Sequence, residues 1–153
     1  MPTTETLPLS VLFERDETAW LENMSRLVAQ GRYAEMDHAN LSEYLSDMAK
    51  RDRREVFSRL ATLLMHLLKW EYQPDQRSGS WRGTIFEQRR DLREILESGT
   101  LYNHACSVLV KAYASARMQA RGETGLSLGT FPVECRWSLE SLLADDEEDA
   151  EGR

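Results

Sequence analysis

An apolar stripe between residues 56 and 68 constrains the fold of this chain more than any other feature. Its members recur at the i, i+3 and i+4 spacing of a helix that buries one side. They are Val56, Phe57, Leu60, Leu63, Leu64, Leu67 and Leu68. The stripe spans nearly half of the helix circumference, so it predicts a central helix that several neighbours contact. Gln73 and Pro74 end this helix, because the residue before a proline avoids the helical conformation.

The rest of the chain also follows the helical period, and no segment alternates convincingly with the period of two that marks a strand. Further helices are predicted over residues 17–30, from 38 through about 48, over about 80–97, over about 100–121 and over 138–143. Their expected N-caps are Asp16, Asp37, Ser80, Thr100 and Ser138. The sequence therefore predicts an all-α, single-domain bundle of about five main helices with a short C-terminal helix. This domain is expected over residues 12–143, after an N-terminal extension of residues 1–11.

Three of these helices carry a face that should point toward the core. The first face contains Trp20, Met24, Leu27 and Val28. The second contains Leu41, Tyr44, Leu45 and Met48. The third is a strip of Ala105, Ala112, Ala116 and Ala120. The small side chains of this strip allow another helix to approach closely. Gly31 is placed to end the helix over residues 17–30 in the left-handed conformation.

The charge of the chain is concentrated at its C-terminus. The net charge is −7 over 153 residues, and residues 144–153 contain six acids and one arginine. Residues 1–143 are therefore close to neutral, at −2. A block of like charges repels itself and supplies no core residues, so residues 144–153 are predicted to be a disordered, solubilising tail. Mimicry of nucleic acid toward a basic partner is the alternative interpretation.

The two cysteines, Cys106 and Cys135, indicate a cytoplasmic protein. They lie far apart and no signal peptide precedes them, so both thiols are expected to be reduced. Cys106 falls among apolar residues of a predicted helix, which favours core packing. Cys135 lies beside Arg136, a cation of the kind that lowers a thiol pKa. No run reaches the about 18 apolar residues of a membrane span, so no membrane partner is expected.

The predicted helix over residues 80–97 places one cation on its apolar face. Arg89 falls inside the apolar arc, and Gln88 falls on the other side of that arc. A buried guanidinium needs a carboxylate or several acceptors, because burying an unpaired charge is very costly. The candidate partners near the start of the helix after residue 37 are Asp37, Glu43 and Asp47. A structural ion pair is one interpretation, and a ligand-binding site is the other.

The sequence contains no catalytic or metal-binding motif. There is no GxSxG, CxxC or HExxH and no glycine-rich phosphate loop. His66 has no second metal ligand three or four residues away, so a hydrogen-bonded histidine is favoured over a metal ligand. We therefore expect no metal and no cofactor.

Two basic clusters raise the question of nucleic acid. Residues 50–54 hold four cations, and the helix over residues 80–97 carries Arg82, Arg89, Arg90 and Arg93. Acids such as Asp52 and Asp91 interleave with these cations. A solvated, salt-bridged face is therefore favoured over a nucleic-acid interface, which requires a broad positive surface.

With these residues identified, the chain resembles a bacterial, notably cyanobacterial, family known as domain of unknown function 29. The resemblance covers about residues 12–143 and rests mainly on LLMHLLKW at 63–70, the Gln73-Pro74 pair and SWRGTIFEQRR at 80–90. NLSEYLSDM at 40–48 and TGLSLGTFPVEC at 124–135 fit less tightly. It implies a compact helical domain and no established activity.

The resemblance also implies a set of polar and aromatic positions. They are Glu43, His66, Lys69, Trp70, Ser80, Trp81, Gln88 and Arg89. We expect them to form one cluster around the turn at residues 72–80. The family has two adjacent glutamates where this chain has Glu43 and Tyr44, which weakens any proposal of a paired-glutamate site.

Three functions remain open at this point, of which the third, nucleic-acid binding, would require a contiguous positive face. The first is a non-enzymatic module that presents a surface of tryptophan and arginine to another protein, since these residues are common interface anchors. The second is a small-ligand binder or enzyme that uses His66, Arg89 and a carboxylate. A cleft that holds those three groups would favour the second function, and a flat or filled surface would favour the first.

Overall fold

The computed structural model describes residues 7–144 and confirms the all-α class. No strand occurs within this range, and five helices of seven or more residues precede one short helix, as predicted. Contacts between Cα atoms divide the chain into two compact units, the first ending at Lys50 and the second starting at Arg51. The domain predicted over residues 12–143 therefore contains two units, which are described in turn.

The first unit begins with helices α1 (Leu9–Arg15) and α2 (Glu17–Ala29), followed by the short helix η1 (Tyr33–Glu35). The predicted N-cap of α2 is confirmed, because the Asp16 carboxylate accepts a hydrogen bond from the Ala19 N–H. Gly31 has a φ of 67° and ends α2 as predicted. Helix α1 was not predicted, and its first three residues lie in the segment assigned to an N-terminal extension.

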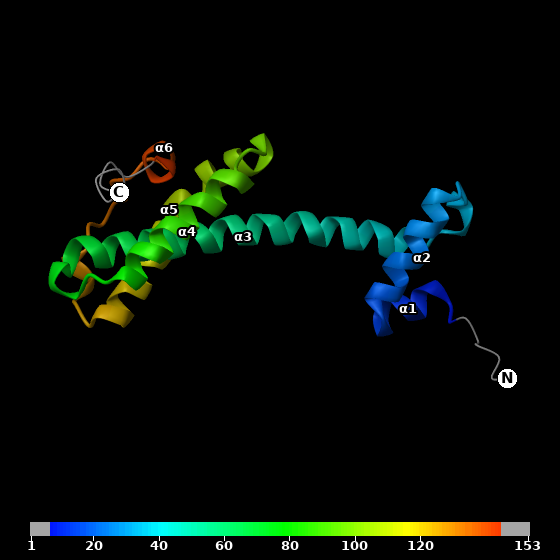
Figure 1. Ribbon diagram of the computed structural model, residues 1–153, viewed down its shortest axis with the longest axis horizontal. Coiled ribbons are helices and arrows are strands. Elements are labelled where there is room, and N and C mark those ends of the chain that lie inside the picture. The colour runs from blue at the N-terminus through cyan, green and yellow to red at the C-terminus, as the bar shows by residue number, and fades with distance from the viewer. Residues whose placement is uncertain (1–6, 145–153) are drawn as a thin grey trace. The chain divides into compact units, whose positions relative to one another are not determined.

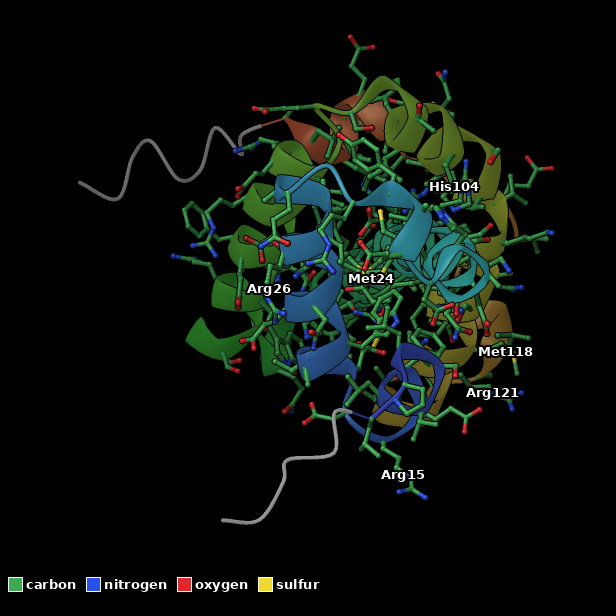
Figure 2. All side chains as sticks on the ribbon, turned by 90° about the vertical axis from the view of Figure 1, so that its right-hand side faces the viewer. Arg15, Met24, Arg26, His104, Met118 and Arg121 are labelled. Carbon is green, nitrogen blue, oxygen red and sulfur yellow. The ribbon has the colours of Figure 1, made fainter. Side chains whose placement is uncertain are left out.

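Trp20 is the centre of the core in this first unit. Its side chain is fully buried between Phe13 and Tyr44, at ring-centroid distances of 4.9 and 5.6 Å. Met24 is also buried and points into the unit, whereas Arg15 points away from it (Figure 2). The predicted burial of Val28 was wrong, because this side chain lies at the exposed edge of the α2 face.

Helix α3 (His38–Tyr72) corrects the sequence analysis, which expected two helices in this range. The two are one continuous helix of 35 residues (Figure 1). Residues 49–55 are exposed on every side, so they carry no apolar signal. They nevertheless continue the helix, because all of this stretch except Asp52 consists of good helix formers, and it contains neither glycine nor proline. Leu45, expected on a buried face, is 59% exposed.

The second unit contains the rest of α3 and three more helices: α4 (Gly79–Ile95), α5 (Gly99–Thr124) and α6 (Leu139–Leu143). The short helices η2 (Pro74–Gln76) and η3 (Leu128–Thr130) lie in the connections. The N-caps of α4 and α5 are Ser78 and Ser98, each two residues before the predicted cap. Both hydroxyls accept a backbone N–H three residues later, the usual N-cap bond.

The predicted apolar stripe of α3 forms the core of this second unit. Val56, Leu60, Leu63, Leu64 and Leu68 are all fully buried. The α5 strip of Ala105, Ala112, Ala116 and Ala120 is fully buried as well and belongs to the same core cluster. Cys106, next to the first alanine of the strip, is exposed, so its predicted core packing was wrong.

Helix α5 also fixes the irregular segment that follows it. The Tyr113 hydroxyl donates to the Pro132 carbonyl at 2.6 Å. The Arg117 guanidinium donates to the carbonyls of Leu128 and Phe131 at 3.0 and 3.2 Å. These bonds hold Phe131 in the core, where its ring packs edge-on against Tyr72.

Candidate functional site

Arg89 is buried as predicted, and the bond that the structure gives it runs to the last helix. Its Nε donates to the Leu142 carbonyl at 2.9 Å, and only 7% of the residue is exposed. One turn later on α4, the Arg93 Nε donates to the Leu143 carbonyl. Two guanidinium groups thus bind carbonyls at the C-terminus of α6, where cations are favoured by the helix dipole.

The pairing of Arg89 with an acid near the start of α3 stays a prediction. Asp37, Glu43 and Asp47 all belong to the first unit. Asp37 accepts hydrogen bonds from the Trp20 indole at 3.2 Å and from the Asn40 amide at 2.7 Å. Glu43 is exposed on α3. The sequence allowed several acceptors in place of a carboxylate, and the Leu142 carbonyl is one such acceptor.

His66 is engaged with its own helix. Its Nδ1 lies 2.8 Å from the Thr62 carbonyl, which matches the hydrogen-bonded histidine favoured from the sequence. Within residues 7–144, no group of three or more histidine, cysteine or acidic side chains is arranged to hold a metal ion.

Lys69 and Trp81 form the first contact between predicted site residues. The Lys69 Nζ lies 4.5 Å from the centroid of the Trp81 ring and 2.6 Å from a carboxylate oxygen of Glu123. Lys69 is nearly buried, whereas about half of the Glu123 side chain is exposed. This group joins α3, α4 and α5, so it stabilises the arrangement of three helices.

Gln88 belongs to a second polar contact between α3 and α4. The Arg59 guanidinium donates to the Gln88 amide oxygen at 3.3 Å and to the Asp91 carboxylate at 3.0 Å. Arg59 also pairs with Glu55 on its own helix at 2.9 Å. Charge pairing on this side of α4 thus follows the salt-bridged face expected from the sequence.

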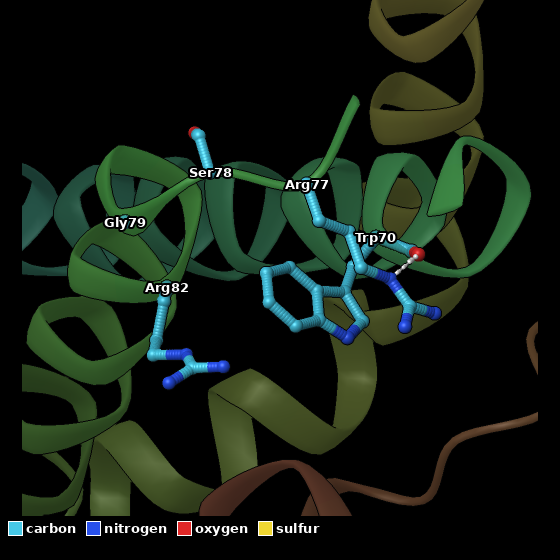
Figure 3. Close-up of a pocket in the computed structure, with 5 residues that line it drawn as sticks. All are labelled: Trp70, Arg77, Ser78, Gly79 and Arg82. Atoms are coloured by element: carbon cyan, nitrogen blue, oxygen red, sulfur yellow. Dashed lines mark hydrogen bonds between the residues drawn. The ribbon is translucent and has the colours of Figure 1, made fainter. Parts of the chain in front are cut away.

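Trp70 lines an open depression of about 430 Å³ that the sequence analysis did not foresee. The depression, hereafter the Trp70 depression, is formed by Trp70, Arg77, Ser78, Gly79 and Arg82 (Figure 3). The guanidinium carbons of Arg77 and Arg82 lie 4.8 and 5.6 Å from the centroid of the Trp70 ring. Figure 3 shows both arginine side chains reaching toward the indole from separate elements.

The local chain explains why these side chains converge. Pro74 turns the chain after α3, and the Arg77 Nε donates to the Trp70 carbonyl at 2.7 Å, which ties the loop back to the end of the helix. Ser78 then starts α4, and Arg82 follows one turn later. Ser80, a predicted site residue, is exposed beside this depression and accepts a bond from Thr84 through its carbonyl.

No carboxylate of the described residues forms an ion pair with Arg77 or Arg82. Among the described residues, the ion pairs of α3 and α4 involve Arg59, Lys69, Glu71 and Arg90 instead. Two neighbouring cations therefore border one aromatic ring, and neither forms an ion pair within the part of the chain that the structure describes. Arg77 was missed because it lies in a loop, and Arg82 because it was grouped with the other arginines of its helix.

Cys135 is not activated by its neighbour. Burial raises the pKa of the Cys135 thiol, and the weak hydrogen bond to the Trp137 carbonyl opposes this only in part. Arg136 is directed to Glu71 and to the Tyr72 hydroxyl. The thiol therefore stays protonated near neutral pH, and the sequence suggestion of a lowered pKa was wrong.

Comparison with known proteins gives one family. The sequence pattern of a family described as "Domain of unknown function DUF29" matches residues 12–147. No curated protein and no solved structure matches the chain. None of the described helices is both long enough and apolar enough to span a membrane.

Proposed function

The chain belongs to the DUF29 family, a domain of unknown function, and we propose that it is a non-enzymatic module that binds another protein through the Trp70 depression. The observation that carries this proposal is the pair of cations, Arg77 and Arg82, beside Trp70 without a carboxylate partner among the described residues. Tryptophan and arginine are the side chains most often found at the energetic centre of protein interfaces.

The other candidate residues support a structural role by comparison. Arg89 binds a carbonyl of α6, and His66 binds a carbonyl of its own helix. Lys69 is held by Glu123 and Trp81. Each of these polar groups already has a partner inside the unit, whereas the arginines of the Trp70 depression keep most of their donors for a partner outside it.

The experiment compares three forms of the full chain as immobilised baits in a lysate of the source cells. The test form carries Arg77→Ala with Arg82→Ala, and the matched control carries Arg121→Ala. Arg121 is an exposed arginine of α5 (Figure 2). We expect a protein that is retained by the wild type and by the control to be lost from the double variant.

Thermal melting shows whether all three baits are folded, so that loss of binding is not loss of structure. If every protein retained by the wild type is retained equally by the folded double variant, the Trp70 depression is not the binding surface. The same conclusion follows if Arg121→Ala lowers retention as much as the double variant does.

A further inference from the structure

We propose that the Trp70 depression recognises the phosphate dianion of a phosphorylated serine or threonine in the partner protein. This inference rests on the proposed function, because it names the chemical group that the same surface binds. It follows from three features: the hydrogen-bond donors left on the two arginines, the free backbone donors of α4, and the charge that these groups present together.

The tryptophan ring leaves the hydrogen-bonding edges of the arginines available. A guanidinium that stacks on an aromatic ring uses its flat face, and its N–H groups point outward in the plane. Arg77 spends only its Nε, on the Trp70 carbonyl. Its two terminal nitrogens and the whole fork of Arg82 remain, and such forks match the oxygen spacing of phosphate or carboxylate.

The start of α4 adds backbone donors at the same place. Ser78 satisfies the N–H groups of Trp81 and Arg82 through its side chain and its carbonyl. The N–H groups of Gly79 and Ser80 have no acceptor among the described residues, because they belong to the first turn of the helix. Ser78 and Gly79 line the depression together with the two arginines, so this helix end lies at the same site.

Charge selects phosphate over carboxylate. Two guanidinium groups and the N-terminal end of a helix, worth about half a positive charge, together exceed two positive charges. A phosphate monoester carries about −1.5 to −2 at pH 7 and offers three acceptor oxygens, whereas a carboxylate carries one charge and two oxygens. The number of available donors also suits the larger group.

In the first test the full chain is titrated with inorganic phosphate. The NMR signal of the Trp70 indole N–H reports binding. A Trp70→Phe variant identifies that signal. We expect a saturable shift that weakens about tenfold or more in Arg82→Ala, since a charged hydrogen bond is removed. Arg121→Ala should behave as the wild type. Binding of a phosphate monoester should also weaken as the pH falls through about 6, where its dianion gains a proton.

A second variant isolates the backbone donors. Gly79→Pro removes one N–H at the first position of α4, where proline is well tolerated. A Cβ at Gly79 would meet no atom within 4 Å, and Ser78 has the extended backbone that proline requires before it. We expect weaker phosphate binding with an unchanged thermal midpoint. Unchanged phosphate binding in the folded variant would show that the backbone N–H groups at the start of α4 do not contribute to the site.

The final arm uses two short peptides that differ only in phosphoserine or glutamate at one position. We expect the phosphoserine peptide to bind at least about tenfold more tightly, and that difference to vanish in Arg82→Ala. Equal binding of the two peptides, or no shift with inorganic phosphate, would overturn this inference. The proposed function would still stand after that outcome if retention of a partner protein required Arg77 and Arg82. It would be rejected separately if no retained protein required them.

Discussion

Asp37 is a side chain whose ionisation contributes to the stability of the first unit. Burial raises the pKa of this carboxyl group, but the hydrogen bonds from Asn40 and Trp20 together outweigh it, so the net pKa is lowered. A group whose pKa is lowered on folding stabilises the fold above its unfolded pKa, about 3.9 for aspartate. That stabilisation is lost as the pH falls through the folded value.

We therefore predict that Asp37→Asn reduces the acid sensitivity of the first unit. The variant should be less stable than the wild type at pH 7, because a charged acceptor for the Trp20 indole is replaced by a neutral one. Between about pH 5 and pH 3 it should lose less stability than the wild type. Urea unfolding monitored by near-ultraviolet circular dichroism gives the free energy of unfolding at pH 7 and at each end of that range.

Glu22 provides the matched control, since it is an exposed acid of α2 in the same unit. Glu22→Gln should lose as much stability on acidification as the wild type does. If Asp37→Asn loses stability as steeply as Glu22→Gln, the ionised Asp37 does not contribute.

Single residues also show where sequence reasoning stops. The burial of Arg89 was predicted from its place in an apolar arc, and the structure confirms it. Its bond to Leu142 was not predicted, because every residue carries a carbonyl and the sequence does not mark which one lies close. The Trp70 depression was missed for a similar reason: Arg77 converges on Trp70 only after a loop has closed.

At the scale of elements, the joint between α4 and α6 depends on two arginines. A hydrogen bond to a charged group contributes about 1.5–3 kcal/mol, so Arg89→Ala should destabilise the second unit by at least about 1.5 kcal/mol. Arg90, one position along, is exposed, and Arg90→Ala should change stability by no more than about 0.5 kcal/mol. Urea melts of the two variants compare them directly.

Arg89→Lys adds a check on the geometry of this joint. Lysine keeps the charge but lacks the planar Nε donor that binds the Leu142 carbonyl. The free energy of unfolding of Arg89→Lys should therefore lie between those of the wild type and of Arg89→Ala. Equal stability of Arg89→Ala and Arg90→Ala would show that the joint does not depend on Arg89.

Helix α3 shows which signal was overlooked at this scale. Apolar periodicity correctly identified a helix on each side of residues 49–55, and the polar stretch between them was read as a break. The absence of glycine and proline in that stretch was the better indicator, because helix propensity alone continues a helix that is already formed. Pro74, by contrast, was a reliable stop.

At the scale of the whole molecule, the helical segment at residues 49–55 should be the least protected part of α3. Its hydrogen bonds are backbone bonds apart from the one that Glu55 accepts from Arg59, and none of its side chains is buried. Local opening there breaks no packing, whereas opening at residues 60–68 disrupts the core. We predict that amides at 49–55 exchange with deuterium at least about tenfold faster than those at 60–68.

Hydrogen exchange read by mass spectrometry on peptides from both stretches provides the measurement. Helix α2 supplies an internal reference, because it is packed around Trp20 and Met24 in the first unit. Equal protection of residues 49–55 and 60–68 would contradict the prediction and would indicate that something covers the exposed stretch in solution.

The alanine strip of α5 limits the substitutions that this sequence can accept. Each of Ala105, Ala112, Ala116 and Ala120 is fully enclosed, so a larger side chain there has no room. A single-base change in an alanine codon yields glycine, serine, threonine, valine, proline or an acid. Only glycine and serine come close to the available volume, and glycine weakens the helix. Single-base substitutions on this face are therefore almost never neutral, whereas the exposed positions beside it tolerate substitution.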